Sequence, residues 1–343
     1  AMNRRPSQSR TGFDSFSPQH TAHFKAAQPG GEFFEPKPRA SLGRRLLLAL
    51  LLMTLIALAV NLAVNQFVRV ARVTVPIRRM DPAFEGYTLL QISDLKGATY
   101  GSNQALIRFA LQNEDFDAVV FTGDMVSSRG NAQPLYALIE MLRELKPDAP
   151  IYMIPGDKDP LPASMSYATG GSPFAPWVLG AKQRCGQLLS APVQIERDGH
   201  TLWLTTSALL SLDMDTMQAQ FERQYLDALA DGDENAIELT TYNLQWLTET
   251  RNARAKMTDA DVYIALTHVP PADEELESAY PGSLRERVHL VLCGHYQGGL
   301  IRLPFAGALF IPSQNLPLYG LLPGADTYFG LTRKGRTYLY VSP

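Results

Sequence analysis

The longest hydrophobic run in the chain lies near its N-terminus. Residues 46–64 are nineteen residues without a charged side chain, and the uncharged stretch between Arg45 and Arg69 is 23 residues long. A helix of that run extends about 28 Å, close to the thickness of a bilayer's hydrocarbon core. We therefore predict one transmembrane helix over residues 46–66. A buried core helix and a cleaved signal peptide are the alternatives; a core helix seldom lacks every charge over this length, and the preceding region is long for a signal peptide.

Beyond this run, segments of strand length alternate with segments of helical periodicity. Residues 67–77 alternate between apolar and polar side chains, as a half-buried strand does. Five further apolar runs are expected to be strands: residues 88–93, 118–123, 151–156, 262–267 and 290–294. Helical patterns cover residues 103–114 and 133–146. This alternation predicts an α/β fold with buried strands.

Composition and charge divide the chain into unlike parts. With 343 residues, 45% hydrophobic and 19% charged, it is neither a disordered nor a collagen-like chain, and its two cysteines exclude a disulfide scaffold. The formal net charge of −3 argues against general nucleic-acid binding, so no nucleic-acid partner is expected. Residues 1–45 carry eight Lys/Arg and three Asp/Glu, a net of +5, which leaves −8 for the remainder.

The charge division suggests three regions and an orientation. Residues 1–45 are rich in Ser, Gln, Pro and Gly without periodicity, which predicts a disordered basic tail. Residues 67–343 are expected to form the globular domain. Because basic residues flank the apolar run on both sides, the positive-inside rule discriminates only weakly between the two membrane orientations. We favour a single-pass protein of the cell membrane, with a cytoplasmic tail and an extracytoplasmic domain.

Five of the expected strands end at an acidic residue or a histidine. These residues are Asp94, Asp124, Asp157, His268 and His295. Ligands of open α/β sheets bind beyond the carboxyl ends of the strands. One such residue alone would be a helix cap or a core histidine, but five at equivalent places predict a shared polar centre. Such a centre need not hold a metal.

At these positions the chain resembles the calcineurin-like metallophosphoesterases, particularly their membrane-anchored bacterial branch. The motifs that carry the resemblance are QISDLKG (91–97), FTGDMV (121–126), IPGDKDP (154–160), LTHVPP (266–271) and CGHYQGGLIRLP (293–304). They cover the body of the chain in the order and spacing of the family. The resemblance implies a four-layer αββα sandwich and a centre of two metals.

The departures from the family pattern fall mainly on one of those metals. By resemblance, its private ligands would stand at Asp94, Lys96 and Gln297, so two of three are altered, and a charged lysine has no lone pair to give. The second metal would be bound by Asp124, Asp157, His268 and His295, all of which can still coordinate. Two imidazoles and two carboxylates suit Zn²⁺, Mn²⁺ or Fe.

Two lysines change the chemistry expected of this centre. Lys158 replaces the family's catalytic histidine and could hold a phosphate as a point charge, but an ordinary lysine is a poor proton donor. Lys96 would lie near the lost metal and could offset Asp94 and Asp124 electrostatically. Two arrangements stay open: one divalent metal at the second site, or a metal-free network of ion pairs.

These observations leave two hypotheses about function. The first is a membrane-anchored phosphoesterase that hydrolyses a phosphate ester with a single retained metal, using Asp94, Lys96 and Lys158 at the catalytic centre. The second is an inactive pseudoenzyme that serves as a binding or scaffolding module. The membrane is the expected partner through the N-terminal helix, and a phosphate ester or a lipid-linked phosphate is the expected ligand.

Overall fold

The computed structural model describes residues 41–64, 67–78, 80–168, 172–277, 284–299, 301–303, 307–311, 320–324 and 328–343. The chain divides into two compact units, Ala1–Asn61 and Leu62–Pro343. The predicted disordered tail, up to residue 40, and the last two residues of the predicted membrane helix lie outside the described residues.

All but the last three residues of the apolar helix α1 (Leu42–Val64) belong to the first unit. The helix begins four residues earlier than predicted, so residues 42–45 belong to the helix and not to the tail. The reason is an N-cap, because the Ser41 hydroxyl oxygen accepts a hydrogen bond from the backbone nitrogen of Arg44 at 3.3 Å. Residues Leu42–Val60 have a mean hydropathy of 2.0, and none of them is buried. By length and composition α1 could therefore cross a membrane.

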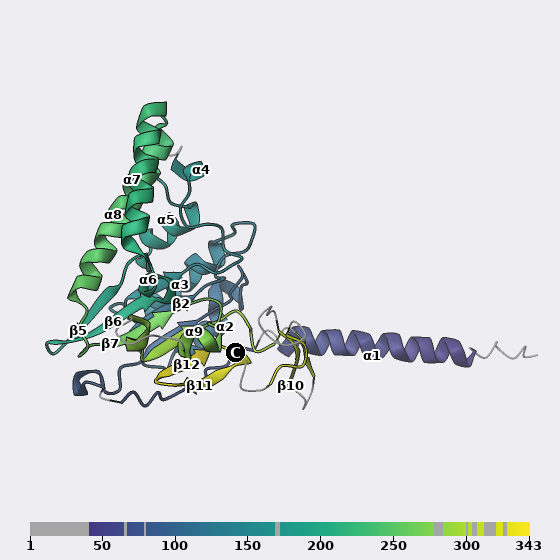
Figure 1. Ribbon diagram of the computed structural model, residues 1–343. Coiled ribbons are helices and arrows are strands. Elements are labelled where there is room, and N and C mark those ends of the chain that lie inside the picture. Colours follow the sequence, from purple (N-terminus) through teal and green to yellow (C-terminus); the bar gives the residue numbers. More distant parts are fainter. Residues whose placement is uncertain are drawn as a thin grey trace, which may run out of the picture. The chain divides into compact units, whose positions relative to one another are not determined.

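The second unit is built on two main sheets (Figure 1). The four-stranded parallel sheet has the order β1 (Leu89–Ile92), β2 (Ala118–Thr122), β3 (Ile151–Ile154) and β4 (Gly186–Leu188). The six-stranded sheet has the order β11 (Gly330–Lys334), β12 (Thr337–Val341), β8 (Leu290–Cys293), β7 (Val262–Leu266), β6 (His200–Thr206) and β5 (Val193–Arg197). A separate ribbon pairs β9 (Ile301–Leu303) with β10 (Gly307–Phe310).

The two sheets pack face to face with helices outside them. Val120 and Tyr152 of the first sheet share one apolar cluster with Leu202, Ile264 and Leu292 of the second. The outer face of the first sheet is covered by α2 (Ala105–Leu111), α3 (Gln133–Leu145) and α5 (Pro176–Gln183). On the second sheet lie α6 (Ser207–Leu210), α8 (Glu234–Lys256) and α9 (Asp273–Glu277). The predicted α/β fold, a four-layer αββα sandwich, is confirmed.

Shorter elements complete the connections. They are the 3-10 turns η1 (Pro82–Phe84), η2 (Ser102–Gln104) and η3 (Leu284–Arg287), and the short helix α4 (Met165–Ala168). The five strands predicted to carry polar residues at their ends are all present, as β1, β2, β3, β7 and β8. The predicted strand at 67–77 is wrong. This segment pairs with no strand among the described residues; its alternation arises because Val68 and Val70 pack into one apolar cluster and Val75 and Ile77 into another.

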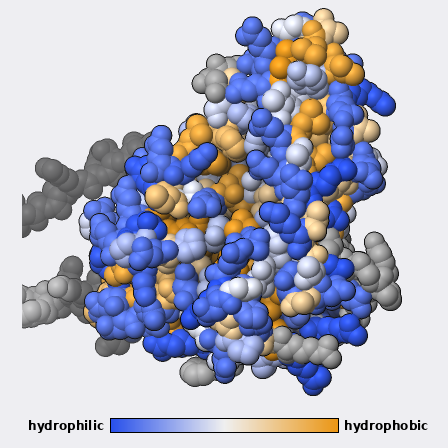
Figure 2. Space-filling model, turned by 90° about the vertical axis from the view of Figure 1, so that its left-hand side faces the viewer, coloured by the Kyte–Doolittle hydropathy of each residue, from blue (hydrophilic) through white to orange (hydrophobic). Residues whose placement is uncertain are grey.

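A helical hairpin of α7 (Met214–Asp231) and α8 projects from the domain (Figure 1). Asp213 and Asp233 cap the N-termini of the two helices, and Gly232 turns the chain in the left-handed conformation at φ 66°. Figure 2 shows apolar residues at the tip of the hairpin, where Leu226 and Leu229 are exposed.

Candidate metal centre

The strand ends bring the predicted polar residues together. Asp94, Asp124 and Asp157 follow β1, β2 and β3, and His268 and His295 follow β7 and β8. Asp94, Asp124 and His295 have positive φ angles of 57°, 54° and 69°, which aim the side chains abruptly out of the strand direction. Left-handed backbone in residues other than glycine is uncommon and is concentrated at functional sites.

Three donor side chains, those of Asp157, His268 and His295, converge within this cluster, and Asp124 approaches His268. His268 Nε2 lies 3.0 Å from Asp157 Oδ1, 3.2 Å from His295 Nδ1 and 3.5 Å from Asp124 Oδ2. His295 Nδ1 lies 3.4 Å from Asp157 Oδ1. Metal bonds of 2.0–2.1 Å in a tetrahedral site place neighbouring ligand atoms about 3.3–3.4 Å apart. The separations among Asp157, His268 and His295 scatter around that value, so these three residues fit one ion, whereas Asp124 falls in a second group with Asp94 and His268.

The surroundings of His268 support the same geometry. Its Nδ1 lies 2.8 Å from the carbonyl oxygen of Thr122. Because a carbonyl oxygen can only accept a hydrogen bond, Nδ1 must carry a proton. Nε2 therefore faces Asp124, Asp157 and His295, and it would offer a lone pair to an ion that displaced its proton. A ligating histidine almost always has such a partner on its other ring nitrogen.

The first-metal position is arranged differently. The oxygens of Asp94 accept hydrogen bonds from the Ser93 hydroxyl at 2.7 Å, the His295 amide at 2.9 Å and the Gln297 side-chain amide at 3.1 Å. The Lys96 ammonium lies 3.6 Å from Asp94 Oδ1 and 3.8 Å from Asp124 Oδ2, between the two carboxylates. Although Asp94, Asp124 and His268 come within 4.8 Å of one another, Asp94 is already supplied with donors. The positive charge of Lys96 beside both carboxylates disfavours a second cation at this position.

Electrostatics in the cluster favour charged side chains. Burial opposes the ionisation of Asp124, but its hydrogen bonds with His268 and the Lys158 amide outweigh it, and its pKa is lowered. Burial likewise opposes protonation of His268, but Asp124 and the Thr122 carbonyl raise its pKa to about 9. Asp157 is also desolvated, yet the hydrogen bond from Lys158 Nζ at 2.6 Å lowers its pKa to about 2.

These shifts describe a balanced charge count without a metal. Three aspartates, Asp94, Asp124 and Asp157, give −3, and Lys96, Lys158 and protonated His268 give +3. The ion pair with Asp157 raises the pKa of Lys158, so this lysine keeps its proton. A divalent ion that displaced the His268 proton would raise the total from zero to about +1.

Asp159 is a supporting residue to which the sequence assigned no role. Its carboxylate accepts hydrogen bonds from the backbone nitrogens of Gly156 at 2.8 Å, Val126 at 2.7 Å and Met125 at 3.3 Å. It thereby holds the loop after β3 against the loop after β2. The sequence feature that could have identified Asp159 is its position two residues after Asp157, within the motif IPGDKDP.

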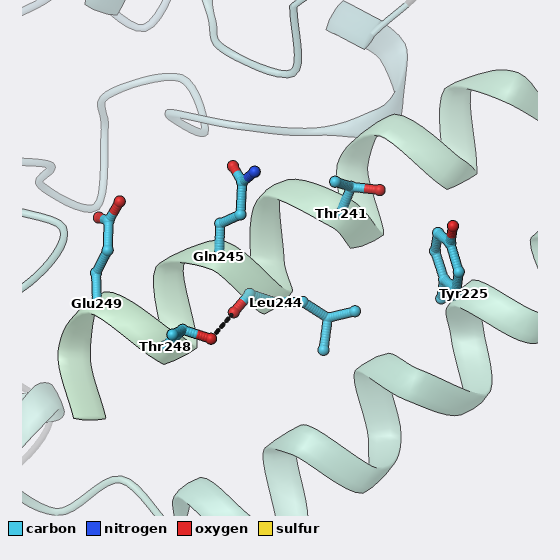
Figure 3. Close-up of a pocket in the computed structure, with 6 residues that line it drawn as sticks. All are labelled: Tyr225, Thr241, Leu244, Gln245, Thr248 and Glu249. Atoms are coloured by element: carbon cyan, nitrogen blue, oxygen red, sulfur yellow. Dashed lines mark hydrogen bonds between the residues drawn. The ribbon is translucent and has the colours of Figure 1, made fainter. Parts of the chain in front are cut away.

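A second concave feature lies between α7 and α8 and shares no residue with the cluster. Figure 3 shows it lined by Tyr225, Thr241, Leu244, Gln245, Thr248 and Glu249. Its polar groups do not converge, because the Thr248 hydroxyl donates to the Leu244 carbonyl of its own helix. The strand-end cluster is therefore the stronger candidate for chemistry.

Comparison with known proteins gives a family match and likenesses to solved structures, two of which are described below. The sequence model of calcineurin-like phosphoesterases matches residues 87–297. A phosphopantetheinyl hydrolase from Mycobacterium tuberculosis is 11% identical, with a TM-score of 0.35 over 74% of this chain and 88% of that one. A putative 5′-nucleotidase from Staphylococcus aureus, in complex with alpha-ketoglutarate, is 12% identical, with a TM-score of 0.32 over 74% of this chain and 48% of that one. No curated protein matches the chain.

Proposed function

The chain belongs to the calcineurin-like phosphoesterase family, and from this premise we propose that it hydrolyses phosphate esters with a single divalent metal. The observation that carries the proposal is the convergence of Asp157, His268 and His295 at tetrahedral ligand separations, with Asp124 3.5 Å from His268. Mn, Zn and Fe suit this mixture of imidazole and carboxylate. When bound, such an ion supplies Lewis-acid polarisation of a phosphoryl oxygen and activation of water.

The two lysines have separate parts in this proposal. Lys96 replaces the second ion as a fixed positive charge beside Asp94 and Asp124, and its side chain is 39% exposed, so it can also contact a phosphoryl oxygen. Lys158 is 59% exposed at the rim and binds the phosphate as a cation. Because its raised pKa keeps the proton on Lys158, it protonates leaving groups poorly. We expect slow turnover and a preference for esters with good leaving groups.

A second candidate function rests on the same two lysines. If cations have replaced both the second ion and the proton donor, the centre can bind a phosphate ester without cleaving it. The chain would then be a pseudophosphoesterase, a binding or scaffolding module. The Lys96 ammonium beside Asp94 and Asp124 favours this alternative, since it occupies the place of the cation that would complete a two-metal site.

Metal analysis combined with turnover separates the candidates. Purified chain is incubated with Mn²⁺, Zn²⁺ or Fe²⁺, and metal content is measured alongside hydrolysis of nitrophenyl phosphate and bis-nitrophenyl phosphate. One metal per chain, with turnover lost in His268→Ala and Asp124→Asn, supports the enzyme. Lys158→Met is the control that should keep the metal. Tight binding of two metals would contradict the role given to Lys96, and phosphate binding without turnover would support the module.

We also propose that α1 anchors the protein, with its domain on the extracytoplasmic side and a lipid-linked or other envelope phosphate as its ligand. Support comes from the length and hydropathy of the helix and from the basic residues of the preceding tail. Protease treatment of spheroplasts tests the sidedness. Digestion of the domain in intact spheroplasts supports the orientation, and protection of the domain until lysis contradicts it.

A further inference from the structure

Three large apolar side chains are exposed on and beside α2. Phe67 is 76% exposed, Leu106 41% and Phe109 71%. Leu106 and Phe109 are three positions apart on the helix, so they lie on the same side of it. We call Phe67, Leu106 and Phe109 the α2 edge. Grouped exposed apolar residues on a soluble domain usually mark a contact with a partner or a membrane.

The segment that carries Phe67 runs beside α2. Val68 and Val70 pack against the apolar cluster that contains Ile107 and Leu111, the buried side of α2. Arg72 forms an ion pair with Glu114, just beyond the end of the helix, and its Nε lies 2.9 Å from Glu114 Oε2. Residues 67–72 and α2 therefore form one continuous part of the domain surface.

The length of the chain ties this surface to the end of α1. The helix ends at Val64, three residue steps before Phe67. Three steps span at most about 11 Å whatever their conformation. If α1 spans a membrane, Phe67 cannot leave the interfacial layer, where aromatic side chains are favoured. Arg69, exposed two positions further on, adds a cation that suits anionic headgroups.

We propose that the α2 edge rests on the membrane surface, with Phe67, Leu106 and Phe109 among the lipid headgroups. The inference rests on the membrane anchoring put forward under the proposed function. A lipid bilayer is the expected partner of the α2 edge, because the short connection to α1 keeps this surface close to the bilayer. A soluble protein partner would need no such tether.

The contact has a consequence for the substrate. The loop that begins at Asp94 and carries Lys96 leads directly through η2 into α2. Its conformation is linked to the α2 edge, since the Leu106 amide donates to the Tyr100 carbonyl at 3.0 Å. A domain held by this edge presents the Lys96 loop near the headgroup layer. Phosphorylated lipids are then the substrate class that reaches the centre most readily.

Site-directed spin labelling of the full chain tests the contact. The label is placed at Phe109→Cys in a Cys185→Ser background, because Cys185 is exposed whereas Cys293 is buried. The protein is reconstituted in vesicles of phosphatidylcholine and phosphatidylglycerol. A matched control carries the label at Leu226→Cys, an apolar position of α7 that is 63% exposed. Relaxation by oxygen and by a water-soluble nickel complex is measured at both positions.

The expected result is a loss of nickel relaxation and a gain of oxygen relaxation at position 109, with the reverse at position 226. Equal nickel relaxation at both positions, in a chain that floats with the vesicles, overturns the surface contact and leaves the anchoring intact. A chain that does not float overturns the anchoring and this inference with it. Metal content is measured on the same sample, so failure of the proposed chemistry is recognised separately.

Discussion

At the scale of single residues, the position of Lys96 distinguishes this centre from one built for two ions. Its ammonium lies within 4 Å of two carboxylates that are almost inaccessible, Asp94 and Asp124. Carboxylates so buried need a cation nearby, whether an ion or a side chain. The lysine supplies that cation permanently and is held by the fold. The stability of the metal-free centre should therefore depend on Lys96.

Removing this cation gives the first prediction. Lys96→Met leaves Asp94 and Asp124 without their shared ammonium, and we expect the metal-free protein to lose about 1–2 kcal/mol of unfolding free energy. This loss is smaller than that for a fully buried ion pair, because Lys96 is partly exposed. The measurement is urea unfolding in the presence of a chelator. Lys158→Met, at the more exposed Lys158–Asp157 pair, is the matched control and should cost less. Equal losses would contradict the central role of Lys96.

A buried histidine outside the centre gives a prediction on pH. His289 stacks on Tyr263 with ring centroids 6.3 Å apart, and its Nδ1 accepts a hydrogen bond from the Tyr263 amide. Burial lowers the pKa of His289 below its ordinary 6.5. The unfolded chain therefore binds a proton more readily than the folded one, and stability should fall as the pH drops below about 6.5. His268, whose pKa is raised, acts in the opposite direction: its contribution is fully present below about pH 6.5 and is lost as the pH rises from there through about 9.

His289→Asn separates these two contributions. The asparagine oxygen can accept the Tyr263 hydrogen bond but does not titrate, while His268 is unchanged. Unfolding free energies are measured in the presence of a chelator from about pH 8 to pH 5. The wild type should lose more stability over that range than the variant. Parallel curves for the two proteins would show that His289 is not the responsible group.

At the scale of elements, the loops after β2 and β3 are locked together. Asp159 accepts three backbone hydrogen bonds across them, and the Lys158 amide donates to Asp124 Oδ1 at 2.8 Å. Gly156 allows the close approach, because a Cβ at this position would overlap the backbone nitrogen and Oδ1 of Asp124. The relative positions of Asp124 and Asp157 thus depend on Gly156, which has no side chain to act as a ligand.

The third prediction follows from that close approach. Gly156→Ala should separate the two loops, lower stability by about 1–3 kcal/mol and abolish stoichiometric metal binding. Thermal unfolding and metal analysis measure the two effects. Gly130→Asn is the control, since Gly130 has φ 78° with open space around it and asparagine tolerates that conformation. Full metal content in Gly156→Ala would show that the loops can adapt and that the donors are less rigid than they appear in the fold.

The elements could be predicted where local pattern and tertiary environment agree. The runs that form β2, β3, β7 and β8 are apolar except for Thr122 and are buried throughout, so their sequence indicates directly that they are core strands. Residues 67–77 show where a local hydrophobic pattern does not predict a strand. Their alternation correctly reports two buried clusters, but strand pairing depends on a neighbouring strand that no local pattern reveals. The start of α1 at Leu42 was missed because Ser41 acts as a cap next to residues with no apolar signal.

At the scale of the whole molecule, the sequence predicted which polar residues meet but not how each is satisfied. Asp94 and His295 lie 201 positions apart, and the hydrogen bond between them depends on how the two sheets face each other. The same holds for Gln91, whose side chain donates to Thr122 in its own sheet and to the Cys293 carbonyl in the other. The ligand roles of Asp124, Asp157, His268 and His295 stay predictions that metal analysis can test.

The anchoring of the whole molecule gives the last prediction. The apolar residues of α1 up to Val60 are exposed, and the middle of the helix carries no charge. A lysine at the centre of a membrane helix costs about 2.5–3.5 kcal/mol, so Leu51→Lys with Leu55→Lys should cost about 5–7 kcal/mol of insertion free energy. We expect the double variant to be extracted by alkaline carbonate and to stop floating with membranes, whereas the wild type resists extraction. Leu226→Lys with Leu229→Lys, at exposed apolar positions of α7, adds the same charge to the domain and should leave the protein anchored. If both double variants are extracted alike, the added charge and not the loss of the membrane helix explains the extraction. If neither variant is extracted, another part of the chain binds the membrane, and the α2 edge is the first candidate.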